Sequence, residues 1–247
     1  MRDFQNGLLL ITGAASGIGA ATARLLAERG AAGLVLVDRD GAALDALDLS
    51  CPARRVAADV GDEAMWDSLD LAGLTHAVVN AGVGEGKPIA ETSLADWRRV
   101  MAVNLDGAFL TLRAAMRAIP AGGAIVVTAS AAGIKAEASI GAYGASKAAV
   151  LHLTRIAAKE GAARGLRVNA IAPGGVETPI WRGVPFFDAM AATQGEAAAF
   201  KAMAGAATPL GRFATAEEIA RQIAFLLSDD AATMTGSVLV SDGGYSL

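Results

Sequence analysis

Short apolar runs alternate along the chain with segments that have helical periodicity. Most apolar runs are unbroken, as expected for parallel strands that are buried on both faces. Strand and helix alternate over residues 1–247 without a linker, so the pattern predicts one α/β domain with a doubly wound, seven-stranded parallel sheet and helices on both faces. The predicted strands are Leu8–Thr12, Leu34–Val37, Arg54–Ala58, Ala77–Val79, Ala124–Thr128, Arg167–Ala172 and Ser237–Val240.

The helical segments have recognisable start signals. Ser93 and Asp96, and again Thr215 and Glu218, have the spacing of capping boxes, in which two side chains satisfy the first free N–H groups of a helix. The predicted helices are Ile18–Arg29, Ala95–Arg117, Tyr143–Arg164 and Ala216–Leu227, with weaker ones at Ala42–Leu47 and Glu63–Leu69.

One stretch breaks the alternation, the segment Thr178–Pro209, which is rich in Gly, Ala and aromatic residues. A long irregular insertion in a compact domain is usually functional or mobile, so residues 178–209 are predicted to form a substrate lid. Its large apolar side chains either close over an apolar substrate or attach the lid to the body or to a partner subunit. These side chains are Trp181, Phe186, Phe187 and Met190.

Composition narrows the class of protein. The 247 residues are 53% hydrophobic and 19% charged, which excludes a disordered chain. The net charge of −4 argues against binding to nucleic acid, which requires a basic face. The lone Cys51 cannot form an internal disulfide, and Gly13 and Gly17 interrupt the apolar run that starts at Leu8. We therefore expect a cytoplasmic protein with no membrane span and no metal site.

The first predicted strand leads directly into a glycine-rich turn, TGAASGIG at positions 12–19. Glycines there allow the backbone to approach a pyrophosphate at the positive end of the following helix. The spacing differs from the generic G-x-G-x-x-G fingerprint, and a glycine-rich turn without a ligand is the alternative. The candidate cofactor contacts are Gly13, Ser16, Gly17, Ile18 and Gly19.

Asp38 ends the second apolar run, where a carboxylate can accept hydrogen bonds from an adenosine ribose. Its charge would repel a 2′-phosphate, and Ser16 offers no positive charge to bind one, so NAD is expected rather than NADP. Arg39 is the dissenting residue, because its guanidinium can pair with a phosphate. Its other interpretation is a solvated arginine that lies over the adenine.

Tyr143 and Lys147 open a helical segment and lie four residues apart, on one helix face. A tyrosine has an ordinary pKa near 10, so it is a poor base at neutral pH. Lowering that pKa by about three units takes roughly 4 kcal/mol of preference for the phenolate. A neighbouring lysine and a bound nicotinamide cation can supply this together. The alternative is an ordinary helix with an amphipathic tyrosine and a surface lysine.

The order of these features resembles the short-chain dehydrogenase/reductase family of about 250 residues, over nearly the whole chain. The resemblance implies a Rossmann-type dinucleotide-binding and catalytic domain that works as a homotetramer. It is carried by TGAASGIG at 12–19, Asp59-Val60, Asn80-Ala81-Gly82, Asn104, Ser130, YGASK at 143–147, Pro173–Thr178 and Asp242-Gly243-Gly244.

The resemblance implies a role for each catalytic candidate. Tyr143 would exchange a proton with the substrate oxygen. Lys147 would lower the pKa of Tyr143 and hold the nicotinamide ribose. Ser130 would hydrogen-bond the substrate oxygen, with Thr128 as a weaker competitor. Asn104 would position a water that links Lys147 to solvent.

The resemblance also implies cofactor contacts beyond the first turn. Asp59 and Val60 would flank the adenine, and the segment Pro173–Thr178 would cover the nicotinamide. The helices that contain Asn104 and Tyr143 would form the subunit interfaces. The full set of these further contacts is Asn80, Ala81, Gly82, Tyr143, Lys147, Pro173, Gly174, Val176 and Thr178, with the last two at the carboxamide.

Two departures from the family pattern lie outside the reacting centre: Thr75 follows Leu74, and Val79 precedes Asn80. They bear on cofactor affinity rather than activity. His76 lies early on the same strand, where a structural role is expected. His152 is expected to be a helix-packing or interface residue.

The reaction expected from these features is hydride transfer between NAD and a secondary alcohol or ketone. Ser130, Trp181 and Phe186 are the candidate substrate contacts. A neutral substrate is favoured because Arg182 and Lys201 stand alone in the lid. The alternatives are a 3-oxoacyl (carrier-protein) reductase, a non-catalytic dinucleotide sensor, and a nucleotide-using methyltransferase, which would leave YGASK unexplained.

Overall fold

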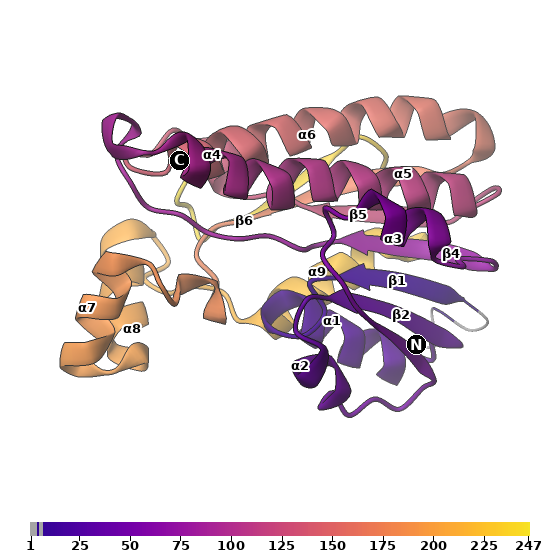
Figure 1. The fold of residues 1–247 in the computed structure, drawn as a ribbon, viewed down its shortest axis with the longest axis horizontal. Helices are drawn as coiled ribbons and strands as arrows, with labels where there is room; N and C mark the ends of the chain where they lie inside the picture. Colours follow the sequence, from indigo (N-terminus) through magenta and orange to yellow (C-terminus); the bar gives the residue numbers. More distant parts are fainter. Residues whose placement is uncertain (1–3, 5–6) are drawn as a thin grey trace.

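Seven parallel strands form one sheet in the computed structural model, which describes residue 4 and residues 7–247. The strand order is β3-β2-β1-β4-β5-β6-β7, so the direction of winding reverses between β1 and β4 (Figure 1). This confirms the predicted doubly wound sheet. The strands are β1 (Leu8–Thr12), β2 (Gly33–Asp38), β3 (Ala53–Ala57), β4 (Leu74–Val79), β5 (Ala124–Thr128), β6 (Arg167–Pro173) and β7 (Val238–Ser241).

Helices cover both faces of the sheet. Figure 1 shows α4, α5 and α6 on one face and α1 and α9 on the other, with α2 beside them. Helices α1 and α9 pack against each other, as do α4 and α6. The helices outside the lid are α1 (Gly17–Glu28), α2 (Gly41–Asp45), α3 (Glu63–Ser68), α4 (Leu94–Met101), α5 (Ala108–Ala118), α6 (Gly141–Gly161) and α9 (Ala216–Leu227).

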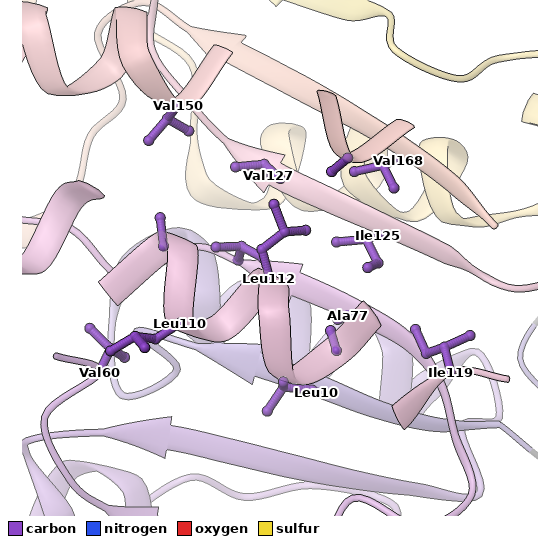
Figure 2. Close-up of a cluster of buried hydrophobic side chains, with 14 of the residues drawn as sticks. Leu10, Val60, Ala77, Leu110, Leu112, Ile119, Ile125, Val127, Val150 and Val168 are labelled. Carbon is purple, nitrogen blue, oxygen red and sulfur yellow. The ribbon is translucent and has the colours of Figure 1, made fainter. Parts of the chain in front are cut away.

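The central strands are buried on both faces because alternate side chains enter two separate cores. On β5, Ile125 and Val127 join the core beneath α5 and α6, whereas Val126 joins the core beneath α1 and α9. Figure 2 shows the first of these cores, where Leu112 of α5 and Val150 of α6 face the sheet. Burial of this kind stabilises the fold by about 25 cal/mol per Å² of apolar surface.

Both predicted capping boxes are present. Ser93 Oγ accepts from the Asp96 N–H at 3.1 Å, and Thr215 Oγ1 accepts from the Glu218 N–H at 3.2 Å. The long helix predicted from Ala95 is interrupted, however, by a π-helical turn at Ala102–Gly107 between α4 and α5. Single π turns inside helices are common at functional sites, and this one contains Asn104.

The segment predicted to be irregular is largely helical, so that prediction was wrong. Helix α7 (Pro185–Gln194) begins with a proline in its first turn, and α8 (Glu196–Ala207) is rich in alanine, the best helix former. Gly195, with φ 85°, separates the two helices. Phe187 and Phe200 form a small core there with Phe213, which follows the segment. Figure 1 shows α7 and α8 set apart from the main body.

The carboxyl ends of the parallel strands meet along one edge of the sheet. Strands β1 and β4 are neighbours there although their helices lie on opposite faces, and ligands of doubly wound folds bind at such a reversal point. Within the described part of the chain, no helix is long and apolar enough to cross a bilayer. The strand ends therefore identify where a binding site is to be sought.

Candidate active site

A cavity of about 740 Å³ runs along the carboxyl edge of the sheet and brings together residues from the ends of six strands. Of the residues predicted for the site, only Gly19 and Asn104 are absent from its lining. The predicted residues that line it are Gly13, Ser16, Gly17, Ile18, Asp38, Arg39, Asp59, Val60, Asn80, Ala81, Gly82, Ser130, Tyr143, Lys147, Pro173, Gly174, Val176, Thr178, Trp181 and Phe186.

The glycines of the first turn are required by its geometry. Gly13 and Gly17 have φ angles of 64° and 51°, in the left-handed region that favours glycine. A Cβ on Gly19 would overlap the Gly13 carbonyl oxygen, so Gly19 allows the turn to close although it does not face the cavity. The turn leaves backbone exposed to the cavity at the N-terminus of α1, the arrangement that suits a pyrophosphate. These residues fit a dinucleotide.

Asn80 joins the first and fourth strand ends. Its side-chain amide donates to the carbonyl oxygens of Thr12 at 3.1 Å and Gly13 at 3.3 Å, while its backbone N–H donates to Thr12 Oγ1 at 3.0 Å. Ala81 N–H donates to the same hydroxyl at 3.2 Å. Asn80 therefore fixes the shape of the glycine-rich turn and also lines the cavity.

The Asp38 carboxylate lies at the same end of the cavity. Its Oδ2 accepts from the Ala15 N–H and its Oδ1 from the Asp40 N–H, both at 3.0 Å. Each oxygen keeps a free lone pair, so the carboxylate can still accept from ribose hydroxyls. Arg39, which is exposed, lines the cavity beside it. This end thus presents one carboxylate, oriented by two backbone N–H groups, and one guanidinium.

Ser130, Tyr143 and Lys147 meet at the other side of the cavity. Lys147 is buried, and its Nζ donates to the Thr128 carbonyl oxygen at 2.9 Å while lying 5.8 Å from the centre of the Tyr143 ring. The Ser130 hydroxyl lies close enough to the Tyr143 phenol to act on its pKa. The two helix residues and the strand-end serine therefore form one polar group that faces the cavity.

The pKa values of this group follow from its burial. Burial raises the pKa of the Tyr143 phenol, and the Ser130 hydroxyl acts in the opposite direction. Burial also lowers the pKa of Lys147 to about 8. In the chain alone, therefore, Lys147 does not bring the pKa of Tyr143 below its ordinary value. The lowering expected from the sequence requires a further positive charge in the cavity.

Ser130 and Thr128 differ in what their hydroxyls contact. Ser130 Oγ accepts from the Ala132 N–H at 3.1 Å and donates weakly to the Pro173 carbonyl oxygen at 3.4 Å. Thr128 Oγ1 is shielded from solvent and has no partner among the described residues. Both residues line the cavity, but of the two it is Ser130 that acts on the pKa of Tyr143. Ser130 thus remains the stronger candidate.

Asn104 lies behind the cavity wall, buried in the π-helical turn. Its Nδ2 donates to the Val83 carbonyl oxygen at 3.0 Å and to Ser146 Oγ at 3.2 Å. Ser146 Oγ in turn donates to the Tyr143 carbonyl oxygen at 2.7 Å. Asn104 therefore connects the loop after β4 to the start of α6.

The substrate end of the cavity is built mainly by residues that sequence reasoning did not identify. Trp181 and Phe186 line it as predicted, whereas Phe187 is buried in the lid core and neither it nor Met190 reaches the cavity. Trp181 also stacks on Phe213, so it both lines the cavity and holds the lid to the body. The missed residues are Glu85, Glu137, Ser139, Ile140, Ile180, Val184, Met203, Phe213 and Tyr245.

Neither histidine belongs to the site. The imidazole of His76 lies edge-on to Phe4, with ring centres 5.6 Å apart, and its Nδ1 is 2.8 Å from Thr75 Oγ1. These contacts suit the structural role predicted for it. His152 is exposed on α6, and its predicted place in an interface stays a prediction.

Fold and site together define a class of protein. A dinucleotide-shaped turn, an acidic residue at the end of β2 and a Ser–Tyr–Lys group on one cavity are the parts that a nicotinamide-dependent oxidoreductase needs. Comparison with known proteins agrees. A family model described as Enoyl-(Acyl carrier protein) reductase matches residues 13–246.

Individual relatives match over almost their full length. Cis-4-hydroxycyclohexanecarboxylate dehydrogenase of Sinomonas cyclohexanicum is 43% identical, with 98% of each chain covered. Cyclohexanol dehydrogenase of Acinetobacter sp. (strain SE19) is 39% identical over 98% of this chain and 96% of its own. A crystal structure of a short-chain type dehydrogenase/reductase from Mycobacterium marinum superimposes with a TM-score of 0.88 at 32% identity, covering 99% of this chain and 97% of that one. The chain belongs to the short-chain dehydrogenase/reductase family and is an oxidoreductase.

Proposed function

We propose that this enzyme interconverts an uncharged secondary alcohol and the corresponding ketone, with NAD as the hydride carrier. The observation that carries the proposal is the placement of Ser130, Tyr143 and Lys147 on the same cavity as Asp38. One end of the cavity then suits the adenosine and the other the reacting carbon. By their names, one relative acts on cyclohexanol, an uncharged secondary alcohol, and another on a hydroxycyclohexane carboxylate, which is charged; both support a secondary hydroxyl on a six-membered ring.

Some residues of the chain would position the substrate and the cofactor, and others would transfer the proton. The nicotinamide supplies the hydride acceptor or donor when bound. In the oxidation, Tyr143 removes the hydroxyl proton as the C–H bond breaks, and in the reduction it returns that proton. Ser130 donates a hydrogen bond to the substrate oxygen. Lys147 adds positive charge near the phenol and holds the nicotinamide ribose, and Asn104 orients a water on the way from Lys147 to solvent.

The other predicted contacts fit a cofactor that lies along the strand ends. Gly13, Ser16, Gly17 and Ile18 would cradle the pyrophosphate, and Asp59 and Val60 would flank the adenine. The segment around Val176 and Thr178 would hold the carboxamide. A Cβ on Gly174 would approach Asp242 within 2.8 Å, so that segment is held close to the chain end.

NAD is favoured over NADP by charge. The Asp38 carboxylate lines the cavity where a ribose would lie, and a 2′-phosphate beside it would meet a like charge. Arg39 is the only cation at this end of the described cavity lining. The Asp38 carboxylate is fixed by two backbone N–H groups, whereas the Arg39 guanidinium is exposed. In this proposal, repulsion of a 2′-phosphate by Asp38 is therefore stronger than its attraction to Arg39.

The description of the family model names an acyl-carrier-protein substrate. The cavity supports such a substrate less well than an uncharged secondary alcohol. An acyl-carrier-protein substrate arrives on a phosphate-bearing arm and needs cations near the cavity mouth. Of the two lid cations, Arg182 is paired with Glu196 at 2.9 Å, and Lys201 is exposed on α8. Glu85 and Glu137 add negative charge at the substrate end. A non-catalytic sensor would have no need of Ser130, Tyr143 and Lys147 together on one cavity.

A screen of ketones and alcohols with NAD(H) and NADP(H), followed at 340 nm, tests this function. We expect turnover of cyclic secondary alcohols or ketones, with a higher kcat/KM for NAD(H). Turnover of acyl thioesters only, or of nothing in the screen, would contradict the proposal.

A homotetramer is part of the proposal. Helices α4, α5 and α6 expose large apolar side chains: Trp97 is 37%, Phe109 44% and Ile156 42% exposed in the single chain. Association would bury them. Light scattering that gives the mass of one chain would contradict the assembly.

A further inference from the structure

Glu85 is the one carboxylate at the substrate end of the cavity whose oxygens lack a partner. It lines the cavity, and both of its carboxylate oxygens are shielded from solvent without a hydrogen bond from any described residue. By contrast, Glu137 on the same cavity accepts from the Tyr245 hydroxyl at 2.9 Å. A desolvated carboxylate without donors destabilises a protein, so a residue kept in this state suggests a ligand that supplies the donor.

The backbone of Glu85 is held from three directions. Val83, two residues before it, is bonded to Asn104 through both its N–H and its carbonyl oxygen. Gly84 lies against the lid, because a Cβ there would be 3.4 Å from the Ile180 carbonyl oxygen. Lys87, two residues after it, forms an isolated β-bridge with Ile140. The backbone of Glu85 is therefore held in place beside the cavity.

The cations near Glu85 are committed elsewhere. Lys87 Nζ pairs with Asp96 at 2.8 Å, and Lys135 Nζ donates to the Tyr245 carbonyl oxygen at 2.7 Å. Lys147 donates to Thr128, and Arg182 pairs with Glu196 across the lid. Lys87 is close enough to attract Glu85, but no described residue donates a hydrogen bond to the Glu85 carboxylate. A substrate carrying a carboxylate or phosphate at this end would add repulsion.

We infer that Glu85 accepts a hydrogen bond from a second hydroxyl of the substrate, so that the substrate is an uncharged diol or polyol rather than a simple alcohol. This inference rests on the proposed function. Ser130 and Tyr143 bind the reacting oxygen, and Glu85 accepts a hydrogen bond from a hydroxyl elsewhere on the same molecule. The apolar side chains of Ile140, Val184 and Trp181 line the same cavity and would cover the carbon skeleton.

The test compares cyclohexanol with cyclohexane-1,2-, 1,3- and 1,4-diols in both the wild-type enzyme and Glu85 variants. In the wild type, the best diol should exceed cyclohexanol in kcat/KM by about tenfold or more, the strength of one charged hydrogen bond. In Glu85→Ala the ratio of kcat/KM for the best diol to that for cyclohexanol should fall to near one. The fall should come from a lower kcat/KM for the diol, since a rise for cyclohexanol alone would not show that Glu85 binds a hydroxyl. Glu85→Gln keeps one acceptor oxygen and should give an intermediate ratio.

Two controls separate specificity from folding. Glu91→Ala removes an exposed carboxylate of the neighbouring segment and should leave the ratio at the wild-type value. The thermal midpoint of Glu85→Gln should not fall below that of the wild type, because the change removes a carboxylate whose oxygens have no hydrogen-bond donor among the described residues. A midpoint several degrees lower would show that the charge is satisfied within the chain and would overturn the inference.

The outcomes also separate this inference from the proposed function. If the wild type turns over cyclohexanol as well as any diol, or if Glu85→Ala keeps the diol preference, Glu85 does not read a hydroxyl while the proposed function stands. If the wild type turns over no alcohol or ketone with either cofactor, the proposed function fails and this inference fails with it.

Discussion

Val83 and Asn104 exchange two hydrogen bonds: the Val83 N–H donates to Asn104 Oδ1 at 2.8 Å, and Asn104 Nδ2 donates to the Val83 carbonyl oxygen at 3.0 Å. The pair joins the π-helical turn between α4 and α5 to the loop that carries Glu85. Because Asn104 also donates to Ser146, the loop and the start of α6 keep a fixed relation. The start of α6, which carries Tyr143 and Lys147, and the loop that carries Glu85 are thereby positioned together.

Asn104→Ala is expected to lower the free energy of unfolding by about 1–3 kcal/mol, since the Val83 groups lose their partners. Turnover should fall by about tenfold or more, because a misplacement of even 1 Å near the reacting centre is costly. Denaturant unfolding and steady-state kinetics measure the two effects. Asp106→Ala, at an exposed position of the same π-helical turn, is the control and should resemble the wild type.

Tyr143→Phe should abolish turnover while leaving NADH binding nearly intact, because only the phenolic oxygen is removed. Kinetics at 340 nm and NADH fluorescence titration measure the two properties. Tyr245→Phe makes the same change at the only other tyrosine, whose hydroxyl is bonded to Glu137, and should keep most of the turnover. Activity above a few per cent in Tyr143→Phe would remove Tyr143 from the acid–base role.

Asp38→Ala should reduce the preference for NAD over NADP by about tenfold, through loss of a ribose hydrogen bond and of repulsion toward a 2′-phosphate. The ratio of the two kcat/KM values is the measurement. Asp59→Ala, which removes a carboxylate near the expected adenine, should leave that ratio near the wild-type value. A wild-type enzyme that works better with NADPH would overturn this interpretation of Asp38.

Gly19→Ala should destabilise the fold by about 3 kcal/mol or more, because the new Cβ overlaps backbone at Gly13 and cannot be accommodated by a side-chain rotation. Gly205→Ala is the matched change in α8, where a Cβ meets nothing within 4 Å. There the higher helix propensity of alanine should stabilise by about 0.5–1 kcal/mol. Equal unfolding midpoints for the two variants would contradict the close approach at Gly19.

Stability should decrease as the pH falls from 6.5 toward 4, with a contribution from His76. Burial, aided by the charge of Arg167, lowers the pKa of His76 from 6.5 to about 4. In that window the unfolded chain binds a proton that the folded chain does not, so the folded state loses at most about 3 kcal/mol. Urea unfolding at several pH values should show a shallower slope in His76→Asn. The other histidine, His152, is exposed, so His152→Asn should keep the wild-type slope.

The sheet could be predicted from the sequence because each strand is a short run buried on both faces. Leu8–Thr12 and Ala124–Thr128 were predicted with the bounds they have in the structure. The fourth strand was begun too late, at Ala77 instead of Leu74, since Thr75 and His76 interrupt the apolar run. The segment 178–209 was predicted to be irregular because it contains glycines and aromatic residues. It forms two helices that contain several alanines and whose apolar side chains pack on one another.

The residues predicted for the cofactor end line one cavity because they follow strand ends in a fixed order, and parallel strands bring those ends to one edge. The substrate end could not be found in this way. Glu85, Glu137 and Tyr245 have no pattern among their neighbours that marks them. They share one cavity only because the loops after β4 and β5 and the segment after β7 converge there.

The sequence by itself determined the doubly wound sheet, the dinucleotide turn and the Tyr143–Lys147 pair, since these depend on periodicity, on glycine geometry and on helical spacing. Only the tertiary structure decided which further side chains line the cavity and which of them have hydrogen-bond partners. It left the Glu85 oxygens desolvated and unpartnered while giving Glu137 a donor. The physical reason is that desolvation depends on every atom packed around a group, and most of those atoms belong to residues remote in sequence.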